Sequence, residues 1–293
     1  MKKGKKAKLS NKSQMGMIIF RFKKNKLAMV GLAIITFLML LCLSASLYID
    51  YQDVYSQSMA NRFIPPFTTR EHIFGTDQFG RDLFARIIYG GRISLLASIG
   101  VVALSLVAGV VVGGFAGYFG GRVDNILMRI CDIFMAVPRM LLAMAVVSAL
   151  GQGTFKMLIA LSLAQFPQFA RTVRASIINL RNQEYVEASK CCGTSSVRII
   201  FKHVVPNGLG PVIVSATLAL GSTILAISSL GFLGIGVESP TPEWGTILSE
   251  NRTNIRYYPY LGLVPGIFIA ISVMCLNFCG DGLRDALDPR TKN

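Results

Sequence analysis

Few residues in this 293-residue chain have the types and spacing that covalent chemistry needs. The two histidines, His72 and His203, are isolated from other metal ligands. Cys275 and Cys279 are one helical turn apart, but no histidine or further cysteine is in register with them, so we expect packing rather than metal binding. The sequence has no phosphate-binding loop, nucleophile elbow or H-E-x-x-H motif. We therefore expect no catalysis, metal site or cofactor on this chain; if ATP is used, another chain hydrolyses it.

The segment 182–206 has the most regular spacing of charged and small residues. It overlaps the stretch "EYVEASKCCGTSSVRIIFKHVVPN", which runs from Glu184 to Asn207. Its first half predicts a short amphipathic helix, because small or apolar residues recur at i, i+3, i+4 and i+7. Those residues are Tyr185, Ala188, Ser189 and Cys192.

A turn and a second helix should follow. Gly193 stands where a helix ends in a left-handed residue, and Thr194 or Ser195 would cap the next helix. Pro206 should open the following span. The second helix has its own apolar stripe, Val197, Ile200, Phe201 and Val204. Periodicity alone leaves two interpretations open: an amphipathic loop on the membrane surface, or a docking element for a soluble partner.

Two ionisable residues lie within apolar stretches. Asp132 lies about two turns into its span and could pair with Arg129, and Arg139 follows Pro138. Ionisable groups at such depth usually face a cavity or a partner. Arg139 and Asp132 are therefore candidates for lining a pathway, although a structural ion pair remains an alternative.

The elements that would position these residues are membrane spans. The chain is 52% hydrophobic and only 15% charged, well below the roughly 25% charge of soluble domains. About 20 apolar residues of helix cross a hydrocarbon core. We predict an all-α, polytopic membrane protein with six transmembrane helices. The fourth is the least secure, because it contains charged and polar residues. The predicted spans are Leu27–Ile49, Ile93–Tyr118, Ile126–Leu150, Phe155–Val173, Pro211–Val237 and Leu261–Gly280.

The distribution of Lys and Arg predicts the orientation. Most of them fall in the segments on the same side as the N-terminus, so both termini and the segment 182–206 should be cytoplasmic. The basic N-terminus next to a span favours contact with anionic lipid over nucleic acid. The predicted organisation is a basic cytoplasmic tail 1–26, a first span 27–49, an extracellular segment 50–91, a core of five helices 92–280, and a cytoplasmic tail 281–293.

Further patterns concern packing and the outer side. Small residues every four positions let helix backbones approach closely, and we expect this of Gly109, Gly113, Gly117 and Gly121. The apolar face of Leu83, Phe84, Ile87 and Ile88 predicts an interfacial helix that leads into the second span. Trp244, the only tryptophan, should lie at the membrane interface in the last outer loop. That loop would either cap the bundle or receive a binding protein.

A family resemblance rests on four motifs. Glu187, Ala188, Ser189, Gly193, His203 and Pro206 resemble the E-A-A…G…I-x-L-P loop of the permeases of binding-protein-dependent ABC importers. Ser189 replaces the second alanine, and His203 and Val205 replace the isoleucine and leucine. "HIFGTDQFGRDLFARIIYGGRISL" (72–95), "GFLGIGVESPTPEWGTIL" (231–248) and "GDGLRDALDPR" (280–290) are similar to the C-type permeases of dipeptide, oligopeptide and nickel importers. The resemblance covers about residues 23–290.

This resemblance implies a type I ABC importer transmembrane domain in a bacterial plasma membrane. Its partners would be a homologous B-type permease, two ATPases that use ATP and Mg, and an extracellular binding protein. The loop around Glu187 and Gly193 would dock on an ATPase. The substrate would be a di- or oligopeptide, or alternatively nickel or a metal chelate. A stand-alone channel or secondary transporter would have only Asp132 and Arg139 for coupling, and an anchor for a nucleic-acid-binding tail would leave the Glu187 loop unexplained.

Overall fold

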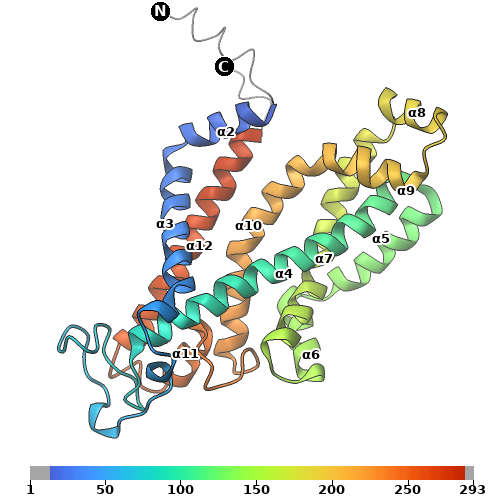
Figure 1. The fold of residues 1–293 in the computed structure, drawn as a ribbon. Helices are drawn as coiled ribbons and strands as arrows, with labels where there is room; N and C mark the ends of the chain where they lie inside the picture. Colours follow the sequence, from blue (N-terminus) through green and yellow to red (C-terminus); the bar gives the residue numbers. More distant parts are fainter. Residues whose placement is uncertain (1–13, 288–293) are drawn as a thin grey trace, which may run out of the picture.

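The computed structural model describes residues 14–287, and this part of the chain is helical with irregular connections (Figure 1). Its longer helices are α2 (Gln14–Lys24), α3 (Lys26–Leu43), α4 (Leu83–Phe119), α5 (Gly121–Ala136), α6 (Arg139–Leu150), α7 (Thr154–Leu180), α8 (Glu184–Cys191), α10 (Val205–Phe232), α11 (Trp244–Asn251) and α12 (Tyr260–Leu287). Short turns of helix are η1 (Ala45–Leu47), η2 (Tyr51–Val54), η3 (Met59–Asn61), α9 (Ser196–Arg198) and the π-helical η4 (Ile199–Val204).

The long helices form one bundle with two distinct ends. α3 lies beside α12, α10 also packs on α12, and α4 runs along α7 in the most extensive helix pair of the described chain (Figure 1). α8 and α9 lie at the same end as α2 and the last turn of α12, whereas α11 lies at the opposite end. We call these the α8 end and the α11 end.

Four helical runs are long and apolar enough to cross a membrane: α3, α4, the continuous run Ser196–Phe232, and α12. The pair α5 and α6 passes the same test together, but it is bent by 87° at the break around Pro138. α7 has 27 residues but carries Lys156, Arg171 and Arg174. The described residues thus support four spans, or five with the bent pair, and the number six stays a prediction.

The predicted interfacial helix is wrong in one respect. Apart from the short turns η2 and η3, no helix within 50–91 is separate from the second span, because Leu83 is already the first residue of α4, which continues unbroken to Phe119. Asp82 caps this helix through its carboxylate, which accepts a hydrogen bond from the backbone N–H of Ala85 at 2.9 Å. Leu83, Ile87 and Ile88 are fully buried against α11 and the outer turns, so this apolar face packs on protein rather than on lipid.

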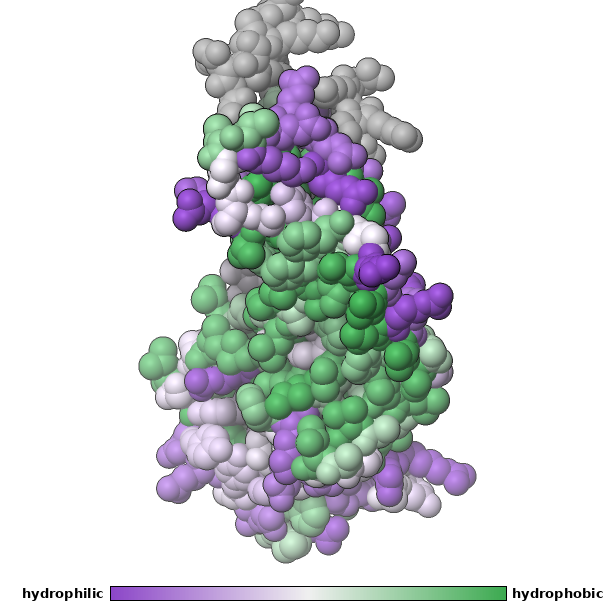
Figure 2. Space-filling model, turned by 90° about the vertical axis from the view of Figure 1, so that its right-hand side faces the viewer, coloured by the Kyte–Doolittle hydropathy of each residue, from purple (hydrophilic) through white to green (hydrophobic). Residues whose placement is uncertain are grey.

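Hydrophobic residues form a broad band across the middle of the molecule, with hydrophilic residues gathered toward both ends (Figure 2). Large apolar side chains stay exposed on the spans, such as Phe37 at 63% and Val107 at 65%. Such exposure is expected where hydrocarbon replaces water as the solvent. Of the predicted tails, 1–13 and 288–293 lie outside the described residues, while 14–24 and 281–287 are helical.

Candidate functional site

The amphipathic helix predicted at 184–192 is present as α8, and a residue outside the predicted stripe is the one buried in the bundle. Val186 is completely buried in a cluster with Val173, Ile177, Ile200 and other apolar side chains of α7 and η4. Tyr185, Ala188 and Cys192 are instead exposed. The predicted apolar stripe therefore faces away from the bundle, and within α8 Val186 is the buried residue that packs on α7 and η4.

Gly193 ends α8 in the predicted left-handed conformation, with φ of +72°. Its N–H donates to the carbonyl of Lys190 at 2.9 Å, and the N–H of Thr194 donates to the carbonyl of Ser189 at 3.2 Å. A β-carbon added at Gly193 would meet no atom within 4 Å. Glycine is thus favoured here by backbone conformation and not by lack of space.

The chain after Gly193 forms one continuous helical run, whereas we expected a short helix followed by a span that Pro206 opens. Ser195 is the N-cap residue, as one of our two candidates, but its side chain makes no capping hydrogen bond. α9, η4 and α10 then follow one another without interruption from Ser196 to Phe232. Pro206 lies in the first turn of α10, where its missing N–H is tolerated, so it does not separate the segment from the span.

All six residues predicted for this segment lie at its surface. Glu187, Ala188, Gly193 and Pro206 are exposed, and Ser189 and His203 are half-buried. Among the described residues, the carboxylate of Glu187 has no hydrogen bond or ion pair. Lys190 lies over the ring of Tyr118 at 5.6 Å, which ties α8 to the end of α4. The carboxylate of Glu187 is thus available to a partner beside the exposed turn at Gly193, on a helix that packs on the bundle through Val186.

Asp132 does not pair with Arg129 as we predicted. Its carboxylate accepts a hydrogen bond from Arg171 of α7 at 2.5 Å. The two side chains remain 44% and 48% exposed. An ion pair that is half exposed on a membrane-spanning bundle must face water or another protein, because lipid tails cannot solvate it.

Arg139 is the first residue of α6, directly after the bend at Pro138. Its Nη2 donates to Oε1 of Gln165 at 2.6 Å. The hydroxyl of Thr223 in α10 donates to the same oxygen at 3.0 Å. Three helices therefore contribute one polar side chain each, and the sequence offered no local sign that Gln165 and Thr223 would join Arg139.

Three of the four predicted packing glycines lie against α7. A β-carbon at Gly113 would come within 2.9 Å of the β-carbon of Val173, and one at Gly117 equally close to that of Ile177. Gly109 likewise faces Phe169. Gly121 is different, because it begins α5 with φ of +53° and a β-carbon added there would meet no atom within 4 Å. Its assignment to packing was wrong: the bend between α4 and α5 uses it for its backbone conformation.

The α11 end contains a buried charge network that sequence reasoning missed. Arg81 donates to Asp77 and to Glu250, each at 2.6 Å, and Arg86 donates to Glu250 at 2.8 Å. The side chains of Asp77 and Arg86 are fully buried. Burial raises the pKa of Asp82 nearby, while hydrogen bonds from Ala85 and His72 lower it in part.

Trp244 is also not where we expected it. It is fully buried, and its indole N–H donates to the carbonyl of Ile87 at 3.0 Å. Next to it, Glu243 is buried and accepts hydrogen bonds from Ser94 and from the backbone of Thr246, both at 2.9 Å. The loop before α11 therefore packs into the bundle instead of presenting an aromatic ring to the interface.

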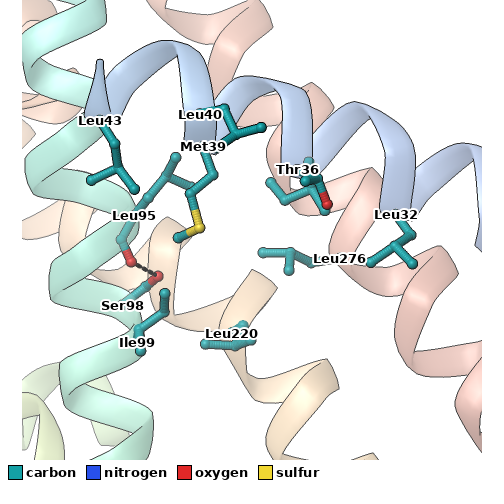
Figure 3. A pocket seen from close by; sticks show the side chains of 11 residues that line it. Leu32, Thr36, Met39, Leu40, Leu43, Leu95, Ser98, Ile99, Leu220 and Leu276 are labelled. Carbon is teal, nitrogen blue, oxygen red and sulfur yellow. Dashed lines mark hydrogen bonds between the residues drawn. The ribbon is translucent and has the colours of Figure 1, made fainter. Parts of the chain in front are cut away.

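An apolar pocket of about 340 Å³ lies between α3, α4, α10 and α12 (Figure 3). Leu43, Met39, Leu220 and Leu276 are among its lining residues. The hydroxyl of Ser98 is already used, because it donates to the carbonyl of Leu95 at 2.7 Å. The pocket therefore offers no charged group to bind a polar ligand.

Comparison with protein families identifies the family of this chain. A family described as "Binding-protein-dependent transport system inner membrane component" matches residues 109–293, which include the bend, Gln165 and the whole α8 segment. The chain belongs to this family. A second family, the N-terminal transmembrane domain of oligopeptide transport permease C, matches residues 13–66.

Curated permeases resemble the chain over most of its length. The dipeptide transport system permease protein of Alkalihalophilus pseudofirmus is 45% identical, with 93% of this chain and 89% of that protein covered. The oligopeptide transport system permease protein of Bacillus subtilis is 40% identical, with 94% and 89% covered. An inward-facing structure of the MetNI methionine ABC transporter shares the fold, with a TM-score of 0.57, 20% identity, and 70% of this chain and 98% of that chain covered. The predicted type I importer fold of this permease is confirmed.

Proposed function

We propose that this permease is one subunit of an ABC importer that takes up di- and oligopeptides across a bacterial plasma membrane. The observation that carries the proposal is the 45% identity over 93% of the chain to a dipeptide permease. In this proposal a homologous permease completes the path, an extracellular binding protein delivers the peptide, and two ATPases drive alternating access. ATP and Mg are bound by those ATPases and not by this chain.

The α8 segment is proposed as the contact with one ATPase. Three features support this: the free carboxylate of Glu187, the open turn at Gly193, and the fixed position of α8 through Val186. A short helix that is packed firmly on the bundle can transmit a movement of the partner to the spans, whereas a loosely attached loop would move without displacing them. The α8 end is then cytoplasmic, and with it α2 and the last turn of α12.

The proposed path runs along the face that bears Asp132, Arg171 and Arg139. Polar groups on this face would contact water and the second permease. The exposed ion pair supports this choice, since the pocket between α3 and α4 is almost entirely apolar and has no charged group for a peptide terminus.

Uptake by cells tests the proposal. Deleting the gene should abolish uptake of labelled di- and oligopeptides, and a plasmid copy should restore it. Normal peptide uptake after deletion, or loss of nickel uptake instead, would contradict the assignment to peptides. Reporter fusions after the C-terminus that are active only outside the cell would contradict the orientation.

A further inference from the structure

A cluster of polar groups at the bend between α5 and α6 has more hydrogen-bond donors than acceptors. Arg139, Gln165 and Thr223 meet there from α6, α7 and α10. The oxygen of Gln165 is shared by Arg139 at 2.6 Å and by Thr223 at 3.0 Å. Nε of Arg139 and Nε2 of Gln165 are buried but make no hydrogen bond within the described residues. Such orphaned buried donors are rare and need a partner.

The local electrostatics are positive with nothing to balance them. Arg139 has no carboxylate within ion-pair distance among the residues that the structure describes. It is also the first residue of the twelve-residue helix α6, whose N-cap residue Pro138 supplies no side-chain cap. The free N–H groups of that first turn add positive potential to the guanidinium. Gln165, which is only 2% exposed, is held with its amide at this point.

Polar side chains are also exposed on the two helices that supply Gln165 and Thr223. Along α7, Gln165, Gln168 and Thr172 follow at i, i+3 and i+7, and Gln168 is exposed. Arg171 belongs to the same side and makes the exposed pair with Asp132. On α10, serines recur every seven residues at 215, 222 and 229, and the last two are exposed. Both α7 and α10 therefore expose polar side chains, with the apolar Leu225 exposed between two of the serines.

We infer that Arg139 and Gln165 form a subsite for the carboxylate of the peptide in transit. The inference rests on the function proposed above. A carboxylate has two oxygens that each accept hydrogen bonds, and a guanidinium matches it in geometry and charge. Bound there, it would accept from Arg139 and from Nε2 of Gln165, and it would supply the negative charge that the bend lacks. Thr223 acts as a positioning residue, because its hydroxyl holds the oxygen of Gln165 and so turns the amide nitrogen toward the ligand.

Transport by the complete complex tests the subsite. The permease pair, the ATPases and the binding protein are reconstituted in vesicles, and uptake is measured for a free-acid peptide and for its C-terminal amide at concentrations that saturate the binding protein. Arg139→Gln should slow uptake of the free acid by about tenfold or more, because hydrogen bonds to charged groups are strong. It should also bring the two peptides to similar rates. Arg139→Lys should restore part of the difference, and Lys156→Gln, which removes a charge elsewhere on α7, should change nothing.

Several outcomes would overturn the inference. One is that Arg139→Gln takes up the free-acid peptide at the wild-type rate. Another is that Arg139→Gln lowers the uptake rates of the free acid and the amide equally and Arg139→Lys restores neither, which would mean a structural role only. Chloride replacement by gluconate, and vesicles of neutral lipid alone, are run in parallel; a defect that follows either change would assign the donors to chloride or to lipid phosphate. If the binding protein does not bind the amide, the inference is tested by the uptake rates of the free acid in Arg139→Gln, Arg139→Lys and Lys156→Gln. A wild-type complex that imports no peptide contradicts the proposed function itself.

Discussion

Gly193→Val is the substitution that most directly tests the α8 segment. The residue has φ of +72°, a region that costs an L-residue about 1 to 2 kcal/mol and a β-branched residue more. No atom lies within 4 Å of the added β-carbon, so the cost comes from the backbone alone. Each 1.4 kcal/mol is tenfold in an equilibrium constant, so we expect the native turn to lose about tenfold or more in population.

The expected consequence is weaker attachment of the ATPase. Val186 should still hold the inner face of α8, and no span is changed, so the variant should insert and assemble normally. The measurement is the amount of ATPase that co-purifies with the permease from membranes, at equal expression checked by immunoblot. Substrate-stimulated ATP hydrolysis and uptake should fall in parallel with it.

Two controls distinguish backbone strain at Gly193 from the loss of glycine itself and from strain elsewhere in the chain. Gly193→Asn should be nearly normal, because asparagine enters the left-handed region readily. Gly234→Val introduces the same kind of strain at φ of +77°, again with no atom within 4 Å, but after α10 at the α11 end. It should leave ATPase retention unchanged. Normal retention and uptake in Gly193→Val would refute the reasoning, and α8 would then be a surface loop without a coupling role.

Further predictions concern charge and packing. Glu250→Ala leaves Asp77 as the one carboxylate paired with Arg81 and Arg86 among the described residues, and it should lower stability by about 3 to 5 kcal/mol, seen as a lower melting temperature. Glu238→Ala, at an exposed residue, should leave the melting temperature unchanged; equal melting curves for the two variants would contradict the network. Gly113→Leu should separate α4 from α7 and cost about 1 to 3 kcal/mol or more by thermal unfolding, while Gly266→Ala, which meets no neighbour, should be tolerated. Asp132→Lys should impair uptake by placing two cations together, and adding Arg171→Glu should restore it; failure of the double variant would exclude their pairing as the cause.

The sequence was most informative where a single residue controls the backbone. The end of α8 at Gly193 was predictable because glycine tolerates positive φ and because the pattern of small residues stopped there. The packing of Gly109, Gly113 and Gly117 on a neighbouring helix followed from their spacing in the same way. Arg139 was identified because a charge in an apolar run is conspicuous by itself.

Long-range partners could not be predicted from local patterns. Asp132 has an arginine three residues away on its own helix, yet it pairs with Arg171 of α7. Helical spacing places Tyr185 and Val186 on different faces of α8 but does not say which face meets the bundle. The burial of Trp244 and the network around Glu250 likewise depend on contacts between segments more than 150 residues apart. The roles of Glu187 and its neighbours in coupling stay a prediction.

The unbroken length of α4 gives the molecule a lever. Its 37 residues extend for about 55 Å. One end carries Arg86 in the charge network with α11. The other end places Phe115 edge-to-face with Phe201 of η4, and Tyr118 under Lys190 of α8. The close contacts of Gly109, Gly113 and Gly117 with α7 join the two helices near the α8 end. Because α4 continues from there as one stiff rod, a tilt imposed at the α8 end would displace the distant α11 end without any relay of side-chain movements.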